Sequence, residues 1–167
     1  AGAALYSISA LDKTGLFDEK HFAYLEDVDI SFRAQLYGYT VYYCPSAICK
    51  HVGSGTSGGK YSDFKVELSA RNSIFLLYKN FPLGLKILNF LPFLLGILIK
   101  SFYFQKKGYG KAYRKGILRG LKEKKEMPIR SIKILSMICI WLSKKTADFK
   151  KLIKFGWDVF IKDFEYL

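Results

Sequence analysis

The spacing of apolar residues in the first part of the chain predicts two helices. Between Leu25 and Leu36, apolar residues recur at every third or fourth position, which is the pattern of one buried helix face, and Gly38 marks its end. The same spacing returns over residues 63–80. A single helical turn is expected before Gly15, because a glycine there can end a helix.

Short apolar runs between these helices predict extended segments. They cover residues 2–8, 39–45 and 46–51, and the second of them closes at Pro45. A loop rich in glycine and serine then leads to the second helix. The first 80 residues are therefore expected to alternate strands with helices.

The second part of the chain is dominated by a long apolar run over residues 81–104, which is long enough to reach across a bilayer. Its polar and small residues fall near one side of a helix: Lys86, Asn89, Gly96 and Lys100. A helix with such a narrow polar strip suits a position in the membrane surface. Spanning the bilayer and lying on it both stay open.

Two further apolar runs follow, over residues 131–142 and 149–167. The first is too short to span a bilayer, and the second has the spacing of an amphipathic helix. A membrane-associating region is one interpretation of residues 81–167. The other is a helical bundle that packs on the preceding domain and turns a basic face to water.

Charge divides the chain at the same place. The net charge is +13, yet residues 1–80 hold eight basic and eight acidic side chains, so the whole excess lies in residues 81–167. Between Lys100 and Lys125 there are ten Lys or Arg against the single acid Glu123. Basic residues beside an apolar helix are attracted to anionic lipid. A domain boundary is therefore expected near residues 81–82.

Cysteine usage and the start of the chain bear on its origin. Cys44, Cys49 and Cys139 form an odd number without the spacing of a disulfide framework, which indicates a reducing compartment such as the cytosol. The sequence begins without an initiator methionine or a signal-type segment. We expect the chain to be a fragment of a longer protein.

Three carboxylates, Glu26, Asp27 and Asp29, lie within four positions where the first predicted helix begins. The free N–H groups of a helix start lower the cost of such charges, by about 0.3 to 1 kcal/mol each. An ordinary surface ion pair between Asp29 and Arg33 would explain part of the cluster. A metal-nucleotide site of D-x-D type is disfavoured, because such a pair normally ends a strand and this one opens a helix.

Five landmarks follow one another in an order that a single E-D pair would not specify. They are Gly2, the F-D-E of Phe17 to Glu19, the E-D of Glu26 and Asp27, Pro45 with Ala47 and His51, and the R-N of Arg71 and Asn72. With this series the sequence resembles the C-terminal half of the catalytic domain in family 2 glycosyltransferases of GT-A fold, especially the rhamnosyl- and galactofuranosyl-type enzymes. The resemblance covers about residues 1–80 and continues weakly to about 130.

The resemblance implies an α/β fold class. Residues 1–80 would be the C-terminal part of a GT-A, Rossmann-like catalytic domain, and residues 81–167 a basic, apolar and mostly helical region that associates with the membrane. The half that carries the nucleotide-binding loop and the strand-terminal D-x-D is not in this sequence. The fragment alone is therefore expected to catalyse nothing.

The resemblance also implies inverting transfer of a sugar from a nucleotide-sugar donor to a saccharide or a polyprenyl-linked saccharide. Asp27 is then the expected base that takes the proton of the acceptor hydroxyl, with Glu26 as its companion carboxylate. Asp29, Arg33 and Arg71 are expected to contact the acceptor or a phosphate, or to support the site. The setting would be cell-surface polysaccharide biosynthesis on the cytoplasmic face of the cell membrane.

The leaving diphosphate needs positive charge, which a divalent metal, Mn²⁺ or Mg²⁺, normally supplies from the other half of the domain. By resemblance, His51 would be a metal ligand, and an imidazole favours manganese. A zinc cluster of Cys44, Cys49 and His51 is an alternative that lacks a fourth ligand at a usual spacing.

Two other classes of function remain as alternatives. The chain could be a membrane-associated adaptor without catalysis. It could also bind RNA, since it is basic and 17% aromatic. The aromatic residues lie mostly on apolar stripes or in predicted strands, and no RNA-binding motif is present, so we expect no nucleic-acid partner. An anionic membrane surface is the expected macroscopic partner.

Overall fold

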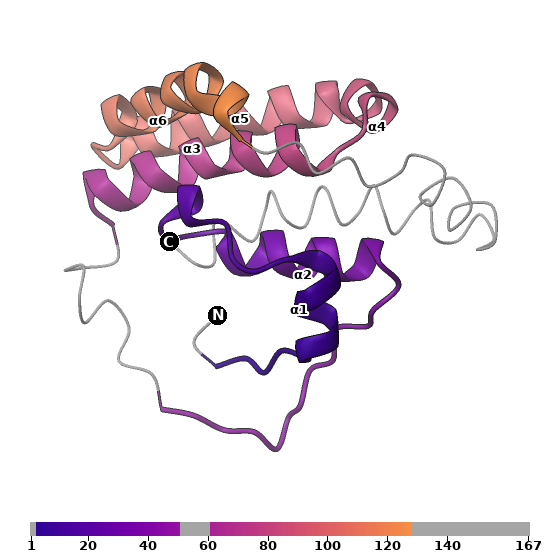
Figure 1. The fold of residues 1–167 in the computed structure, drawn as a ribbon. Coiled ribbons are helices and arrows are strands. Elements are labelled where there is room, and N and C mark those ends of the chain that lie inside the picture. The colour runs from indigo at the N-terminus through magenta and orange to yellow at the C-terminus, as the bar shows by residue number, and fades with distance from the viewer. Residues whose placement is uncertain (1–2, 51–60, 128–167) are drawn as a thin grey trace.

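The computed structural model describes residues 3–50 and 61–127. Of these residues, 69% are helical and none forms a strand. The elements in chain order are α1 (Ile8–Thr14), the 3-10 helix η1 (Glu19–His21), α2 (Glu26–Leu36), α3 (Asp63–Asn80), α4 (Leu83–Leu88), α5 (Phe90–Lys106), α6 (Gly110–Glu123) and the 3-10 helix η2 (Lys124–Glu126). The long helix α3 lies in the middle, with α5 and α6 on one side of it and α1 and α2 on the other (Figure 1).

The predicted helices of the first part are confirmed. Apolar spacing between Leu25 and Leu36 corresponds to α2, the second periodic stretch corresponds to α3, and the helical turn before Gly15 is α1. Ser62 begins α3 as an N-cap, because its side chain accepts a hydrogen bond from the N–H of Lys65 at 3.3 Å.

The predicted α/β fold class is wrong for the described residues, which contain no sheet. Residues 3–7 and 39–50 lie outside helices, and in the second segment Val41, Tyr42 and Tyr43 are exposed. An apolar run becomes a strand only when a neighbouring segment supplies the ladder of hydrogen bonds. No such neighbour occurs in the part of the chain that the structure describes. The expected GT-A, Rossmann-like fold of residues 1–80 is therefore wrong for the described residues.

The long apolar run of the second part is broken into two helices. Asn89 separates α4 from α5, and Pro92 lies in the first turn of α5, where its missing N–H costs no helical hydrogen bond. Among the described helices, none combines the length and the hydropathy needed to cross a bilayer. The runs predicted over residues 131–142 and 149–167 lie outside the described residues.

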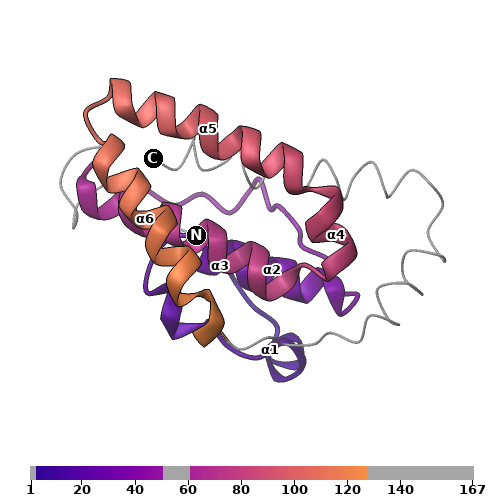
Figure 2. The ribbon, with the colours of Figure 1, turned by 90° about the horizontal axis from the view of Figure 1, so that it is seen from above.

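Helix α6 packs closely on α3 because it presents two glycines to it. A Cβ atom on Gly116 would lie 2.2 Å from the carbonyl oxygen of Glu67, and one on Gly120 would lie 2.9 Å from that of Arg71. Beside this contact, a core cluster joins α3, α5 and α6; its buried members are Val66, Ala70, Phe104, Ala112 and Tyr113. Figure 2 shows α5 and α6 diverging from the turn that connects them.

Candidate functional site

The loop before α2 has an unusual backbone. Phe22, Tyr24 and Leu25 have φ angles of 62°, 68° and 66°, in the left-handed region that residues other than glycine rarely occupy. Each such residue costs on the order of 1 to 3 kcal/mol, and the conformation persists only where the surroundings determine it. Leu25 is buried and is the N-cap of α2, so the loop fixes where the helix begins and places Glu26 as its first residue.

Asn72 on α3 holds this loop in place. Its side-chain amide nitrogen donates hydrogen bonds to the carbonyl oxygens of His21, Ala23 and Tyr24, at 2.9, 2.8 and 2.7 Å. The Asn72 side chain is fully buried. Because three carbonyls of a strained loop converge on one amide group, the loop conformation depends directly on this residue.

Arg71 completes this contact. Its guanidinium donates to the carbonyl oxygens of Lys20 and His21, at 2.9 and 3.2 Å, and to the side-chain oxygen of Asn72 at 3.1 Å. The guanidinium also lies over the ring of Phe75, 5.1 Å from its centroid. We call Arg71 and Asn72 the loop clamp.

Behind the loop, Asp29 is the centre of a buried ion network. Its carboxylate accepts hydrogen bonds from Arg33 at 3.0 Å, from Lys79 at 2.9 Å and from Asn80 at 2.6 Å. Burial raises the pKa of the Asp29 carboxyl, but the hydrogen bond from Asn80 and the charges of Lys79 and Arg33 lower that pKa more, to below its ordinary value. The spacing of Asp29 and Arg33 predicted an ion pair, and the pair is confirmed, although it is buried and not at the surface.

The same network ties α1 to α2 and α3. The Arg33 guanidinium donates to the carbonyl oxygens of Thr14, Gly15 and Leu16 at the end of α1. Lys79 forms a second ion pair with Asp18, at 2.8 Å. These contacts satisfy the donors of two buried cations, which is the condition under which buried charges are tolerated.

Glu26 and Asp27 lie at the edge of this network, half-buried in the first turn of α2. Asp27 accepts a hydrogen bond from the N–H of Val28 at 2.8 Å. One carboxylate oxygen of Glu26 is buried and has no hydrogen-bond partner among the described residues. A buried polar atom without a partner is uncommon in proteins and points to a missing donor.

Aromatic side chains lie near the two carboxylates and in the loop that precedes them. Burial raises the pKa of the Tyr6 phenol, and the negative charges of Asp27 and Glu26 raise it further, which places Tyr6 within their electrostatic reach. In the strained loop, Phe22 is exposed and meets the ring of Phe64 edge to face, with 6.3 Å between centroids. Carboxylates can bind the hydroxyl groups of a ligand, and exposed rings can bind its apolar face.

The structure separates the predicted site residues into two groups. Asp29, Arg33 and Arg71 are buried and bonded to protein groups, whereas Glu26 and Asp27 remain partly exposed. His51 lies outside the described residues. In the described ranges no group of three or more His, Cys, Asp or Glu side chains could hold a metal ion, so these ranges alone do not fit the predicted Mn²⁺ or Mg²⁺ centre.

Several residues of this site escaped the sequence analysis. Lys79 and Asn80 looked like the polar end of a helix, although they follow the loop clamp by two helical turns and so share its side of α3. Two pairs of a basic residue followed by asparagine, eight positions apart, were the available signal. Asp18 and Tyr6 gave no comparable signal, because only the fold brings them to the site.

Comparisons of the chain with protein-family models, with curated proteins and with solved structures find no match. The function of the chain must therefore be inferred from its residues and their geometry. Two of the landmarks in the sequence, the E-D pair and the R-N pair, are linked by a loop, which the R-N pair holds and which leads directly into the E-D pair.

Proposed function

We propose that this chain takes part in the inverting transfer of a sugar from a nucleotide-sugar donor to a hydroxyl group of a saccharide or a lipid-linked saccharide. Asp27 is the general base of this reaction. One observation carries the proposal: the pair Glu26 and Asp27 is presented at the start of α2 by a strained loop that Asn72 holds through three hydrogen bonds. Strain of this kind is concentrated at functional sites.

The reaction uses the Asp27 carboxylate to take the proton of the acceptor hydroxyl. The acceptor oxygen forms a bond to the anomeric carbon on the face opposite the leaving group. The bond between that carbon and the diphosphate oxygen breaks, and the nucleoside diphosphate leaves with the electron pair. Glu26 retains the capacity to accept a hydrogen bond from the acceptor, because its buried oxygen has no donor within the described part of the chain.

The surrounding residues support positioning and binding. Asp29, Arg33 and the loop clamp fix the direction of α2 and of its first turn, since their polar groups bond to protein atoms. Phe22 and Phe64 offer apolar faces on which the C–H side of a sugar ring can pack. This chemistry does not require the α/β fold class that the resemblance implied.

The charge of the leaving diphosphate must be neutralised outside this group of residues. A divalent metal, Mn²⁺ or Mg²⁺, with His51 as a ligand stays a prediction from the resemblance. The described residues supply no cluster of metal ligands of their own. The saccharide acceptor and the location on the cytoplasmic face of the membrane are parts of the same proposal.

The test measures sugar transfer by the protein as it occurs in the cell, in its own membranes, with labelled dTDP-rhamnose and UDP-galactofuranose as donors. Asp27→Asn removes the base, so turnover is expected to fall at least about 100-fold while donor affinity stays unchanged. Asp63→Asn is the matched control, because Asp63 is an exposed carboxylate in the first turn of α3. Turnover of Asp27→Asn equal to that of the control would remove Asp27 from this role.

The alternative of an adaptor without catalysis predicts a different outcome. Neither donor would be consumed by the unaltered protein, and Asp27→Asn would change nothing. The observation that favours an enzyme over an adaptor is the strained loop itself, because a docking surface does not require three left-handed residues ahead of a helix.

A further inference from the structure

Helices α4 and α5 expose an unusually apolar surface. From Leu83 to Phe102, most of the side chains that face away from the protein are leucine, isoleucine or phenylalanine, and many keep more than half of their surface exposed. Leu91 and Leu98, for example, are 66% and 57% exposed. We call the exposed apolar side chains of α4 and α5 the apolar ridge. An apolar patch of this kind marks an interaction site, because water alone solvates it poorly.

One side of α5 faces the protein and not water. Gly96, Lys100 and Phe104 recur at every fourth position and are all buried. Of the strip that the sequence predicted, Asn89, Gly96 and Lys100 are buried, whereas Lys86 lies on α4 and is half-buried. The side of α5 that faces outward is left almost without polar groups over a helix length of about 25 Å.

Basic side chains border the apolar ridge, and acidic ones are absent from this stretch. Residues 81–122 contain nine Lys or Arg and no Asp or Glu. At the end of α5, Lys106 lies over the ring of Phe102, 4.6 Å from its centroid, and so keeps its charge next to the ridge.

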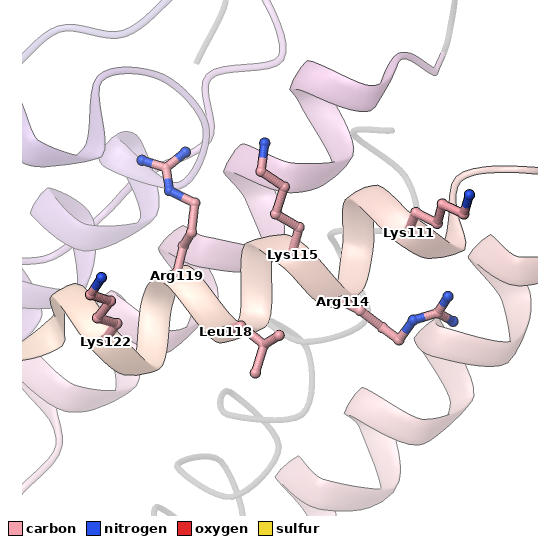
Figure 3. Close-up of a pocket in the computed structure, with 6 residues that line it drawn as sticks. All are labelled: Lys111, Arg114, Lys115, Leu118, Arg119 and Lys122. Atoms are coloured by element: carbon pink, nitrogen blue, oxygen red, sulfur yellow. The ribbon is translucent and has the colours of Figure 1, made fainter.

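Helix α6 extends this basic border. A shallow, open depression on α6 is lined by five basic residues and one leucine: Lys111, Arg114, Lys115, Leu118, Arg119 and Lys122 (Figure 3). Arg114 reaches toward α5, where it donates to the side chain of Gln105 at 2.8 Å. Lys115 and Arg119 point to the other side and pair with Glu67 on α3. The basic side chains of α6 thus begin where the apolar ridge ends.

We propose that the apolar ridge and the basic side of α6 dock together on an anionic lipid bilayer, with α5 lying in the plane of the interface. The ridge would enter the boundary between head groups and acyl chains, and the lysines and arginines would lie among the lipid phosphates. An anionic bilayer accommodates both the apolar ridge and the basic side chains. Either the ridge or the basic side chains alone would also be compatible with other partners. The proposal does not depend on sugar transfer.

Other occupants fit the surface less well. Residues 128–167 carry eight basic and four acidic side chains, so their net charge has the same sign as the surface they would cover. A second copy of the chain would bring the same basic border against itself. RNA would satisfy the charges of α6 but would leave the ridge in water.

The test uses the full chain with two kinds of vesicle, phosphatidylcholine alone and equal parts of phosphatidylcholine and phosphatidylglycerol, in a sedimentation assay. The chain is expected to bind the anionic vesicles at least about tenfold more tightly than the neutral ones. The double variant Leu91→Gln and Leu98→Gln should weaken binding at least tenfold. The matched control, Ile8→Gln with Leu16→Gln, replaces side chains that are 77% and 67% exposed on the other side of α3 and should bind normally.

The basic side of α6 is tested in the same assay. Lys111→Gln with Lys122→Gln should weaken binding to the anionic vesicles and leave the weak binding to neutral vesicles unchanged, because only the electrostatic attraction is removed. Equal binding of all variants would overturn the proposal. The proposal would also be overturned if the chain bound neither kind of vesicle and instead dimerised through the ridge or bound a labelled RNA oligonucleotide.

A second readout locates the bilayer. With the native cysteines replaced by serine, an environment-sensitive fluorophore is placed on Leu98→Cys or, as the control, on Lys13→Cys of α1. The emission from position 98 should shift to the blue when anionic vesicles are added, and the emission from position 13 should not. No shift at position 98, or equal shifts at both positions, would contradict docking through α5.

Discussion

Residues 3–50 and 61–80 differ from residues 81–127 in how they depart from the usual pattern of apolar side chains inside and charged side chains outside. The first region buries charged groups, with Asp29, Arg33 and Lys79 almost fully removed from water. The second region exposes apolar groups along the whole of α4 and α5. Buried charges and exposed apolar patches are the informative exceptions in a folded chain, because both cost free energy that ordinary packing would avoid.

The difference between buried charges and exposed apolar side chains indicates which kind of partner each region suits. A buried network of charges fixes side chains in one geometry, which suits a group that must meet a reacting atom. An apolar surface has no such directionality and suits a deformable partner such as a bilayer. The close packing of α6 on α3 joins the two regions, so that helix α3 connects the proposed reaction centre with the proposed docking surface.

The largest expected effect breaks the buried network. Asp29→Asn leaves the buried Arg33 without its anion and removes one of the two ion pairs of Lys79, which keeps its pair with Asp18, so the free energy of unfolding should fall by about 3 to 5 kcal/mol. Urea denaturation followed by circular dichroism measures it. Glu126→Gln is the control, since it removes an exposed ion pair with Lys20 and should cost under about 1 kcal/mol. Equal losses for the two variants would mean that the Asp29 network is not buried.

The next effect breaks the loop clamp. Asn72→Ala removes the donor of one buried and two partly buried hydrogen bonds to loop carbonyls, so the free energy of unfolding should fall by about 2 to 3 kcal/mol. Ser73→Ala, one position further along α3, removes a single local hydrogen bond and should cost about 1 kcal/mol or less. If both variants unfold alike, the loop does not depend on the clamp.

A smaller effect separates the two regions. Gly116→Ala introduces a Cβ atom against the backbone of α3, so α6 must shift, at a cost of about 1 to 3 kcal/mol. Gly84→Ala on α4 meets nothing within 4 Å and should be neutral or slightly stabilising. Thermal unfolding compares the two. An unchanged melting temperature for Gly116→Ala would show that the helices do not approach as described.

The smallest effect depends on pH. His21 is fully buried and its ring nitrogens have no partners in the described ranges, so burial lowers the pKa of its imidazole; Lys79 and Arg71 lower it further, while Asp29 and Asp18 oppose them. Below pH of about 6.5 the unfolded chain takes up a proton that the folded chain does not. Stability should therefore fall as pH drops below that value, by at most about 1.4 kcal/mol per pH unit.

A variant separates this group from others. His21→Leu should flatten the pH dependence between about 6.5 and 4. The carboxyls of Asp18 and Asp29 have lowered pKa values, so their contribution is lost only at lower pH, below about 4. An identical slope in His21→Leu would show that this histidine does not titrate as a buried group.

Local pattern was sufficient for the helices and insufficient for their surroundings. The apolar spacing between Leu25 and Leu36 predicted α2 because a helix satisfies its own backbone. The predicted strands failed because pairing depends on a distant segment, and nothing local to Val41 or Tyr43 specifies one. The same holds for Gly96 and Lys100. Their spacing places them on one side of α5, but only the tertiary packing decides that this side is buried.

The candidate site shows the same limit. The spacing of Asp29 and Arg33 predicted their pair, yet its burial depends on Lys79 and Asn80, which α3 delivers from 50 and 51 residues away. The R-N pair was identified only by resemblance, and the structure supplies its physical contact, with the loop that precedes Glu26.

The most direct measurement is the rate of sugar transfer by Asp27→Glu in the protein as it occurs in the cell. This variant keeps the negative charge and the basicity of the side chain but moves its carboxylate by one methylene group. If the loop clamp places the base for catalysis, turnover should fall at least about 100-fold while the circular dichroism spectrum stays unchanged. Turnover equal to that of the unaltered protein would contradict the account.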